Sequence, residues 1–201
     1  KKWYCCSGHF LWVGNRTRDL EGSHLEFLRG IHNPIGIKIS SSISAKELIK
    51  ICKKLNPENE KGRITLISRM GVDKIHDSLP KLIEQIKSHN LNVLWICDPM
   101  HGNTYKLKSG YKTRHFDTIV KEIEAFFSIH NDLGTIPGGI HLEFTGEHVT
   151  ECLGGTDNII DNDLESQYDT ACDPRLNVNQ SLELAYRITK LLIKNKGNLN
   201  G

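Results

Sequence analysis

The sequence predicts an α/β fold built around a parallel sheet, and two features of the chain support this. Short apolar runs alternate with longer segments of helical periodicity, at intervals of roughly 30 residues. Most of the runs are apolar on both faces, as strands covered on both sides are. The chain has 201 residues, 38% of them hydrophobic, enough for one domain with its own core. The alternation indicates parallel βα units, either in a doubly wound sheet or in part of a (β/α)8 barrel.

The elements follow one another along the chain in a regular order. The predicted strands cover residues 9–14, 35–40, 63–68, 91–96 and 139–144. The predicted helices cover residues 45–55, 75–86, 116–130 and 180–194. In the second of these, Pro80 is expected to mark the start of the helix, because proline is favoured in a first helical turn. The third has the clearest apolar stripe, formed by Phe116, Ile119, Val120, Ile123, Phe126 and Phe127.

Composition and charge argue against several classes of protein. The formal net charge of +2 predicts no broad attraction to nucleic acid or to an anionic membrane. No apolar run approaches the roughly 18 residues that a membrane span needs. The six cysteines are scattered without repeated CxxC spacing, which favours free thiols and a cytoplasmic location. The first residue is Lys1 and a strand follows almost at once, so we expect the chain to be part of a longer protein.

A charged or coordinating side chain stands at or near the C-terminal end of every predicted strand. Arg16 and Arg69 follow the first and third runs, and His101 follows the fourth. Lys38 and Glu143 lie within the second and fifth. In a barrel the C-terminal ends of the strands converge on one mouth, where active sites are built. This distribution favours a (β/α)8 barrel over a doubly wound sheet.

The three cations of this set predict an anion site. Lys38 is surrounded by apolar residues in "IGIKIS", and a buried lysine needs an anion or a cavity. Arg69 in "LISRMG" repeats the pattern, whereas Arg16, taken alone, could be a loop residue paired with a nearby acid. Because arginine grips phosphate through its planar fork, phosphate is the most plausible anion.

A second group of residues predicts a metal site. His101, Glu143 and Asp173 supply one imidazole and two carboxylates, which suit Mn, Fe or Zn and leave room for a substrate. His141 lies on the same face of its run as Glu143 and is a rival ligand. Cys97 and Cys172 each precede an Asp-Pro pair. Each could be a small buried side chain that packs in the core or a further thiolate ligand of the metal.

The motifs that carry these residues are long and ordered. They are "GNRTRDLEGSHLEFLRGIHNPIGIKIS", "RITLISRMG", "CDPMHGNT", "GYKTRHFD", "PGGIHLEFTGEHVTECLGG" and "CDPRLNVNQSLELA". Over nearly all of residues 4–193 the chain resembles the class II 3-deoxy-D-arabino-heptulosonate 7-phosphate (DAHP) synthase family. The resemblance implies a TIM barrel of which this chain supplies about the last five βα units. Residues 1–201 would then be the C-terminal part of a single catalytic domain.

The resemblance also implies an activity. Members of this family are transferases that condense phosphoenolpyruvate with erythrose 4-phosphate, giving DAHP and phosphate, in the first step of the shikimate pathway to chorismate and the aromatic amino acids. The reaction depends on a divalent metal, most plausibly Mn, with Co, Fe or Zn as alternatives. Matched by motif, the phosphoenolpyruvate positions are Asn15, Arg16, Lys38 and Arg69, the metal positions are His101, Glu143 and Asp173, and the catalytic pair is Lys38 and His101. The full-length protein is expected to be a homo-oligomer, cytoplasmic or, in a plant, plastidic.

Two departures from the family pattern bear on activity. Asn15 stands where the family usually has an acid, and an amide cannot serve as a general base. The family's barrel also begins upstream, with a Cys that completes the metal site, an Arg for phosphoenolpyruvate and a Lys/Arg-rich motif for erythrose 4-phosphate. We therefore expect the isolated chain to be a poor catalyst. The alternative is a noncatalytic remnant that binds phosphate or metal, or docks on a full-length synthase.

Overall fold

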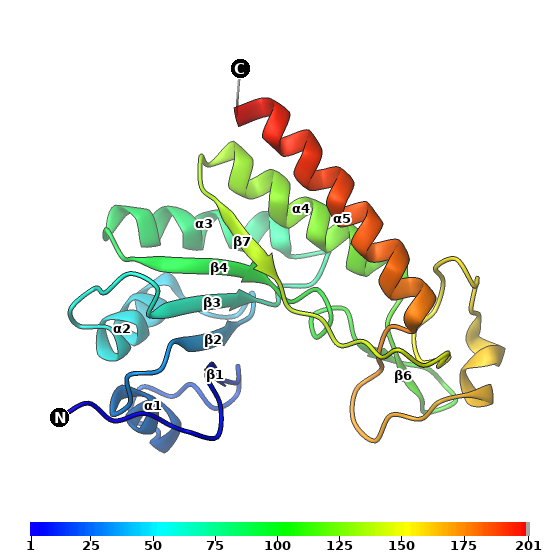
Figure 1. The fold of residues 1–201 in the computed structure, drawn as a ribbon, viewed down its shortest axis with the longest axis horizontal. Coiled ribbons are helices and arrows are strands. Elements are labelled where there is room, and N and C mark those ends of the chain that lie inside the picture. Colours follow the sequence, from blue (N-terminus) through cyan, green and yellow to red (C-terminus); the bar gives the residue numbers. More distant parts are fainter. Residues whose placement is uncertain (200–201) are drawn as a thin grey trace.

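The computed structural model describes residues 1–199, with side chains described through residue 193. Its centre is a five-stranded sheet in which every neighbouring pair is parallel (Figure 1). The strands, in spatial order, are β1 (Leu11–Val13), β2 (Ile35–Ile39), β3 (Ile64–Ser68), β4 (Val93–Cys97) and β7 (Pro137–Ile140). Spatial order therefore follows chain order without a reversal. A doubly wound sheet reverses its strand order at a switch point, so this sheet is wound in one direction, as a barrel is.

The helices form a layer that follows the same sequence. They are α1 (Ser23–Arg29), α2 (Ala45–Leu55), α3 (Ile75–Ser88), α4 (Phe116–Asp132) and α5 (Val178–Leu199). Each of these helices contacts the next along the chain. No described helix is both long and apolar enough to cross a membrane.

The burial of the central strands explains their apolar sequences. All five residues of β2 and all five of β3 are buried. The isoleucines at 35, 37 and 39 alternate with Gly36 and Lys38, so one face of β2 packs toward the core and the other faces the inner side of the sheet. Gly36 is required there, because a Cβ at this position would lie 2.9 Å from the Cβ of Trp12. Lys38 therefore lies on the inner face of the sheet and is itself buried.

The C-terminal ends of three strands align side chains at one rim of the sheet. Ladder hydrogen bonding continues one residue past each strand, from Arg69 N to Ile39 O (2.9 Å), Asp98 N to Ser68 O (2.6 Å) and His141 N to Cys97 O (2.7 Å). Residues that occupy the same row of a parallel sheet point to the same face. The side chains of Arg69, Asp98 and His141 therefore stand in one row on the inner side.

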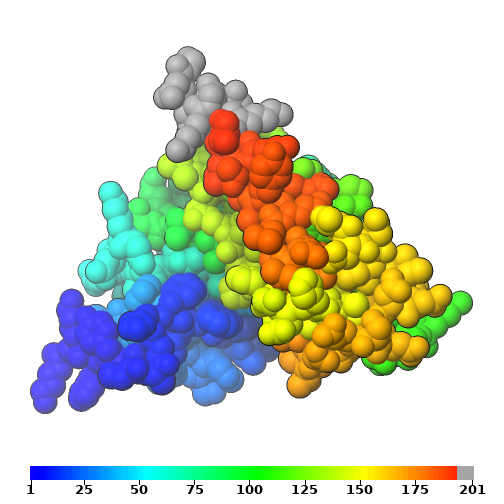
Figure 2. Space-filling model, turned by 45° about the vertical axis from the view of Figure 1, so that its right-hand side comes forward, coloured from blue at the N-terminus to red at the C-terminus, as the bar shows by residue number. Residues whose placement is uncertain are grey.

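A lobe without long strands extends from this rim. It contains a hairpin of β5 (Tyr105–Lys106) and β6 (Lys112–Thr113) and a 3-10 helix, η1 (Asp161–Ser166). Figure 2 shows the yellow and orange residues of the lobe gathered beside α5, with the green hairpin segment at its outer edge. A small apolar cluster of Leu153, Ile159 and Leu164, with Leu107 and Tyr111 against it, holds the lobe together. The lobe carries Asp173 back toward the rim.

Several expected boundaries differ from the structure. The run at residues 139–144 becomes a strand only at Pro137–Ile140, so Glu143 lies beyond the strand and not within it. Pro80 does not start a helix but lies inside α3, which begins at Ile75. Ile75 and Leu79 are fully buried, and their burial holds the helical turn upstream of the proline despite its missing N–H donor. Helix α1, the hairpin and η1 had no strong periodicity and were not predicted from the sequence.

Core packing can be tested at Phe126 on helix α4. Phe126 is fully buried, with its ring centroid 4.5 Å from that of His130. Phe126→Ala should lower the free energy of unfolding by about 3–5 kcal/mol, because it removes a large buried ring and leaves a cavity. Phe27→Ala, at a position that is 53% exposed, is the matched control and should cost less than about 1 kcal/mol. Equal losses in urea unfolding curves would contradict the assignment of Phe126 to the core.

Candidate active site

A buried carboxylate, Asp98, organises the rim. It lies directly after β4 and is fully buried. Its Oδ1 accepts hydrogen bonds from the backbone N–H groups of Met100 (3.1 Å) and His101 (3.2 Å). Its Oδ2 lies 2.7 Å from His101 Nδ1 and 3.1 Å from Lys38 Nζ. One side chain thus shapes the turn after β4 and joins Lys38 to His101.

Charge explains why this carboxylate stays ionised in the interior. Burial raises the pKa of Asp98, but the hydrogen bond from His101 and the charges of His101 and Lys38 outweigh it, so its pKa falls well below the usual range. Removing either partner would leave a buried charge without compensation, which is strongly destabilising.

Lys38 is held in place by three groups. Besides Asp98, its Nζ lies 3.4 Å from His141 Nε2 and 5.7 Å from the centroid of the Trp12 ring. Burial and the charge of Lys38 lower the pKa of His141, so this imidazole is neutral and able to accept a hydrogen bond. The buried lysine therefore has an internal anion, Asp98, that its sequence neighbours did not reveal.

Arg69 retains donors for a ligand. One Nη2–H donates to the carbonyl of His101 (3.2 Å), which ties the loop after β3 to the loop after β4. Its buried Nε makes no hydrogen bond to any described residue. A buried guanidinium donor without a partner is costly, so this atom suits an anionic ligand.

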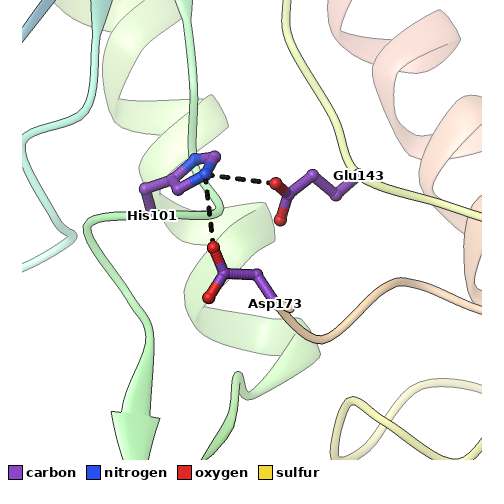
Figure 3. Close-up of side chains that lie close together, drawn as sticks. All are labelled: His101, Glu143 and Asp173. Carbon is purple, nitrogen blue, oxygen red and sulfur yellow. Dashed lines mark ion pairs between the residues drawn. The ribbon is translucent and has the colours of Figure 1, made fainter. Parts of the chain in front are cut away.

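The side chains of His101, Glu143 and Asp173 converge at the rim, as Figure 3 shows. His101 Nε2 lies 3.1 Å from Glu143 Oε1 and 3.9 Å from Asp173 Oδ2. The ligand atoms of the three residues all lie within 4.8 Å of one another. Because Asp98 occupies Nδ1 of His101, the other ring nitrogen is directed to the carboxylates, the usual arrangement for a histidine that binds a metal. The predicted trio is thus brought together from three distant segments.

The donor set fits a divalent cation. One imidazole nitrogen and two carboxylates match the ligands that Mn, Fe and Zn accept in proteins. Glu143 Oε2 is buried, lies 2.7 Å from Arg114 Nη1 without hydrogen-bond geometry, and accepts no hydrogen bond from any described residue. Hydrogen bonds that His101 donates to the carboxylates of Asp98 and Glu143 raise its pKa, so a metal competes with a proton for this imidazole. Despite burial, His101 and Arg114 lower the pKa of Glu143 to about 2, so it stays ionised.

A second buried carboxylate, Glu122 of α4, holds the two rim loops together. Its Oε1 accepts from the backbone N–H groups of Met70 (3.1 Å) and Gly71 (3.0 Å), and its Oε2 accepts from Asn103 Nδ2 (2.6 Å). The two loops approach so closely that a Cβ on Gly102 would lie 2.4 Å from the nitrogen of Gly71. The contact fixes the spacing between the Arg69 loop and the His101 loop.

Two predicted site residues lie apart from this cluster. Arg16 is exposed, in a hollow lined by Asn15, Arg16, Arg18, Asp19, Leu20 and Glu47. Asn15 accepts a hydrogen bond from Arg18 Nε (3.4 Å), and Arg18 is paired with Glu47. A place for Asn15 and Arg16 in the phosphate site stays a prediction.

The structure shows the surroundings of the three residues that the sequence left as alternative ligands. Cys97 is fully buried, and burial raises its pKa well above the usual range, which favours the packing role. Cys172 is an exposed free thiol in a hollow that also contains Glu143 and Asp173. His141 lies against Lys38 and is not one of the three residues that converge as ligands.

A parallel barrel segment with cations and a His/Glu/Asp trio at the C-terminal ends of its strands defines a class, that of α/β-barrel proteins whose candidate site lies at that end of the barrel. The model of the Class-II DAHP synthetase family matches residues 1–189, and the chain belongs to this family.

Relatives and solved structures agree with this assignment. The chain is 52% identical over 191 residues to phospho-2-dehydro-3-deoxyheptonate aldolase AroG of Mycolicibacterium smegmatis, covering 95% of this chain and 41% of the relative. It is 53% identical over 188 residues to phospho-2-dehydro-3-deoxyheptonate aldolase of Streptomyces coelicolor, covering 94% of this chain and 42% of the relative. The chain thus spans well under half the length of these two proteins.

A truncated 3-deoxy-D-arabino-heptulosonate 7-phosphate synthase from Thermotoga maritima superposes with a TM-score of 0.55 at 14% sequence identity. The match covers 92% of this chain and 58% of that structure. At this identity the likeness bears on the fold, and it confirms the barrel prediction.

Glu122 generates a prediction about pH. Burial raises its pKa to about 7, so the folded state holds a proton that the unfolded state has released, and stability falls as pH rises from about 4.5 to about 7. Glu122→Gln should remove this loss, on the order of 3 kcal/mol, from the pH dependence of the free energy of unfolding. Glu124→Gln, on the exposed side of the same helix, is the control and should leave the pH dependence unchanged. Parallel pH profiles for the parent and the Glu122 variant would refute the assignment.

Proposed function

We propose that this chain is the C-terminal part of the TIM-barrel catalytic domain of a DAHP synthase, which condenses phosphoenolpyruvate with erythrose 4-phosphate and releases phosphate. The observation that carries the proposal is the convergence of His101, Glu143 and Asp173 beside Lys38 and Arg69, in a chain of this family. A metal trio next to buried cations suits an anionic substrate that reacts at a polarised carbonyl.

The proposed mechanism assigns roles to these residues. Lys38 and the unpaired donor of Arg69 would hold the phosphate and carboxylate of phosphoenolpyruvate, so that its C3 faces the aldehyde. His101, Glu143 and Asp173 would hold a divalent metal, Mn being our first choice, which supplies Lewis-acid polarisation of the aldehyde when bound. Asp98 would orient His101 and position Lys38 beside the reacting atoms.

The proposed condensation needs no covalent enzyme intermediate. C3 of the enol phosphate bonds to the aldehyde carbon, whose oxygen takes up a proton, and C2 gains oxocarbenium character. Water adds to C2, and phosphate leaves as the keto group forms. Lys38 is the candidate to move a proton at the aldehyde oxygen or the water. Asn15 could orient that water but cannot deprotonate it.

We also propose that further βα units of the same barrel cover the open flanks of the sheet. The flanking strands, β1 and β7, each have one partner within the described chain. Trp12 and Leu94, in one row of the inner face, are 50% and 46% exposed, and Phe27 on α1 is 53% exposed. Apolar surface and unpaired strand edges of this kind are normally covered. In a two-chain arrangement, the same flanks would dock on a partner that carries those units.

The test of the activity is phosphate release from phosphoenolpyruvate that depends on erythrose 4-phosphate, with Mn²⁺ added. The longer protein that includes the upstream barrel units should turn over. Its His101→Ala variant should lose both bound metal and at least about 10³-fold in kcat, because one ligand and the Asp98 contact are gone. His148→Ala, at an exposed histidine, is the matched control and should behave as the parent.

Two other outcomes would redirect the proposal. A parent that binds Mn²⁺ without turnover would support the noncatalytic alternative and direct attention to Asn15. A His101→Ala variant with normal turnover would contradict the site itself.

A further inference from the structure

The largest fully buried side chain near the site is an arginine to which neither the family motif nor the metal prediction assigns a role. Arg114 follows β6 and is 0% exposed. A guanidinium cannot lose its charge in a protein, so its burial must be compensated by nearby acceptors and anions. Its contacts therefore indicate what it is there to hold.

These contacts reach all three segments that carry metal ligands. Arg114 Nε donates to Thr104 Oγ1 (2.8 Å), three residues after His101. Nη1 donates to the carbonyl of Pro174, the residue after Asp173. The same Nη1 lies 2.7 Å from Oε2 of Glu143.

Each contact is itself anchored. Thr104 Oγ1 donates to the carbonyl of Met100 (3.0 Å), within the turn that Asp98 shapes. The backbone around Arg114 is fixed to the lobe, because its carbonyl accepts from Leu153 N (2.8 Å) and the hydroxyl of Thr113 donates to the carbonyl of Glu151 (2.9 Å). The guanidinium thus sits on a rigid strand end rather than on a mobile loop.

The charges around the trio point to the same role for Arg114. Glu143 and Asp173 converge on His101 and repel each other when both are ionised. Lys112 Nζ lies 3.2 Å from Asp173 Oδ1 but is half exposed, so solvent weakens its effect. Arg114 is the buried positive charge on the Glu143 side of the trio, and it makes contact through the carboxylate oxygen that does not face His101.

We propose that Arg114 is the positioning residue of the metal site. It sets the relative positions of the His101, Glu143 and Asp173 segments and directs one oxygen of Glu143 toward the metal. The inference rests on the metal site proposed above and goes beyond it, because it assigns a role to a residue that is not a ligand. Residues that orient metal ligands in this way typically account for 10- to 100-fold in affinity.

The experiment measures Mn²⁺ affinity directly, by calorimetry or by the free-ion EPR signal, in the longer protein without substrates. Arg114→Lys keeps the charge but cannot reach three segments with one ammonium, and should weaken Mn²⁺ binding about 10-fold. Arg114→Met removes the charge as well and should weaken it about 100-fold. The graded loss separates a charge effect from a packing effect.

Arg63 provides a matched control at the opposite end of β3. Its guanidinium donates to three backbone carbonyls, those of Leu28, Ile31 and Asn33, and it contacts no ligand segment. Arg63→Lys should lower the melting temperature and leave Mn²⁺ affinity unchanged.

Thr104→Val is a second variant that keeps the charge of Arg114 and removes only the acceptor of its Nε. It should weaken Mn²⁺ binding about 3- to 10-fold, and it covers the case in which the Arg114 variants do not fold. Folded Arg114 variants, or a Thr104→Val variant, with parental Mn²⁺ affinity would overturn the inference. A parent that binds Mn²⁺ but has no synthase activity would refute the proposed function and leave the inference standing.

Discussion

The rim of this sheet depends on a buried ion pair between a lysine and an aspartate. Asp98 is fully buried directly after strand β4, and Lys38 is 7% exposed on β2. Neither charge would be tolerated there alone. Together they fix the ends of β2 and β4 relative to each other. Asp98 also contacts Nδ1 of His101, which leaves the other ring nitrogen of His101 directed to the carboxylates of the trio. The orientation of the metal trio therefore follows from this pair.

Around that pair the rim is built from further buried polar contacts, each spanning loops that are distant in sequence. Glu122 on α4 joins the loops after β3 and β4. Arg114 joins the segments after β4, after β7 and before α5. Removing one partner from a buried polar network is costly, so these contacts hold the ligand segments in position before any substrate arrives. The ligand segments are thus held by polar side chains that are shielded from solvent.

Much of the fold could be predicted from the sequence, for a physical reason. Strands buried on both faces must be apolar runs, and a parallel connection must cross by a helix, so the βα alternation and the single rim were predictable. Lys38, Arg69 and His101 stood out because each polar group follows or interrupts such a run. The lobe between Phe144 and Asn177 was not predictable, because its backbone is held by side-chain contacts without periodicity, such as the pair of Glu151 with Arg175.

The long-range pairings that sequence reasoning missed share a property. Asp98, Arg114 and Glu122 each pair with a residue 51 to 60 positions away, namely Lys38, Pro174 and Gly71, and no local pattern encodes such pairings. A signal was nevertheless present for Asp98, which directly follows the apolar strand "VLWIC" and precedes proline, where a carboxylate can cap the next turn. For Glu122 the signal was a charge within the apolar stripe of α4.

Asp98 joins the trio of His101, Glu143 and Asp173 to Lys38, and we infer that the trio and the cations form one site. The most direct measurement is a crystal structure of the longer protein with Mn²⁺ and phosphoenolpyruvate, with anomalous scattering recorded at the manganese edge. We expect one anomalous peak bound by His101 Nε2, Glu143 and Asp173, with the phosphate of phosphoenolpyruvate against Lys38 and Arg69. A peak away from His101, or a phosphate that contacts neither Lys38 nor Arg69, would contradict it.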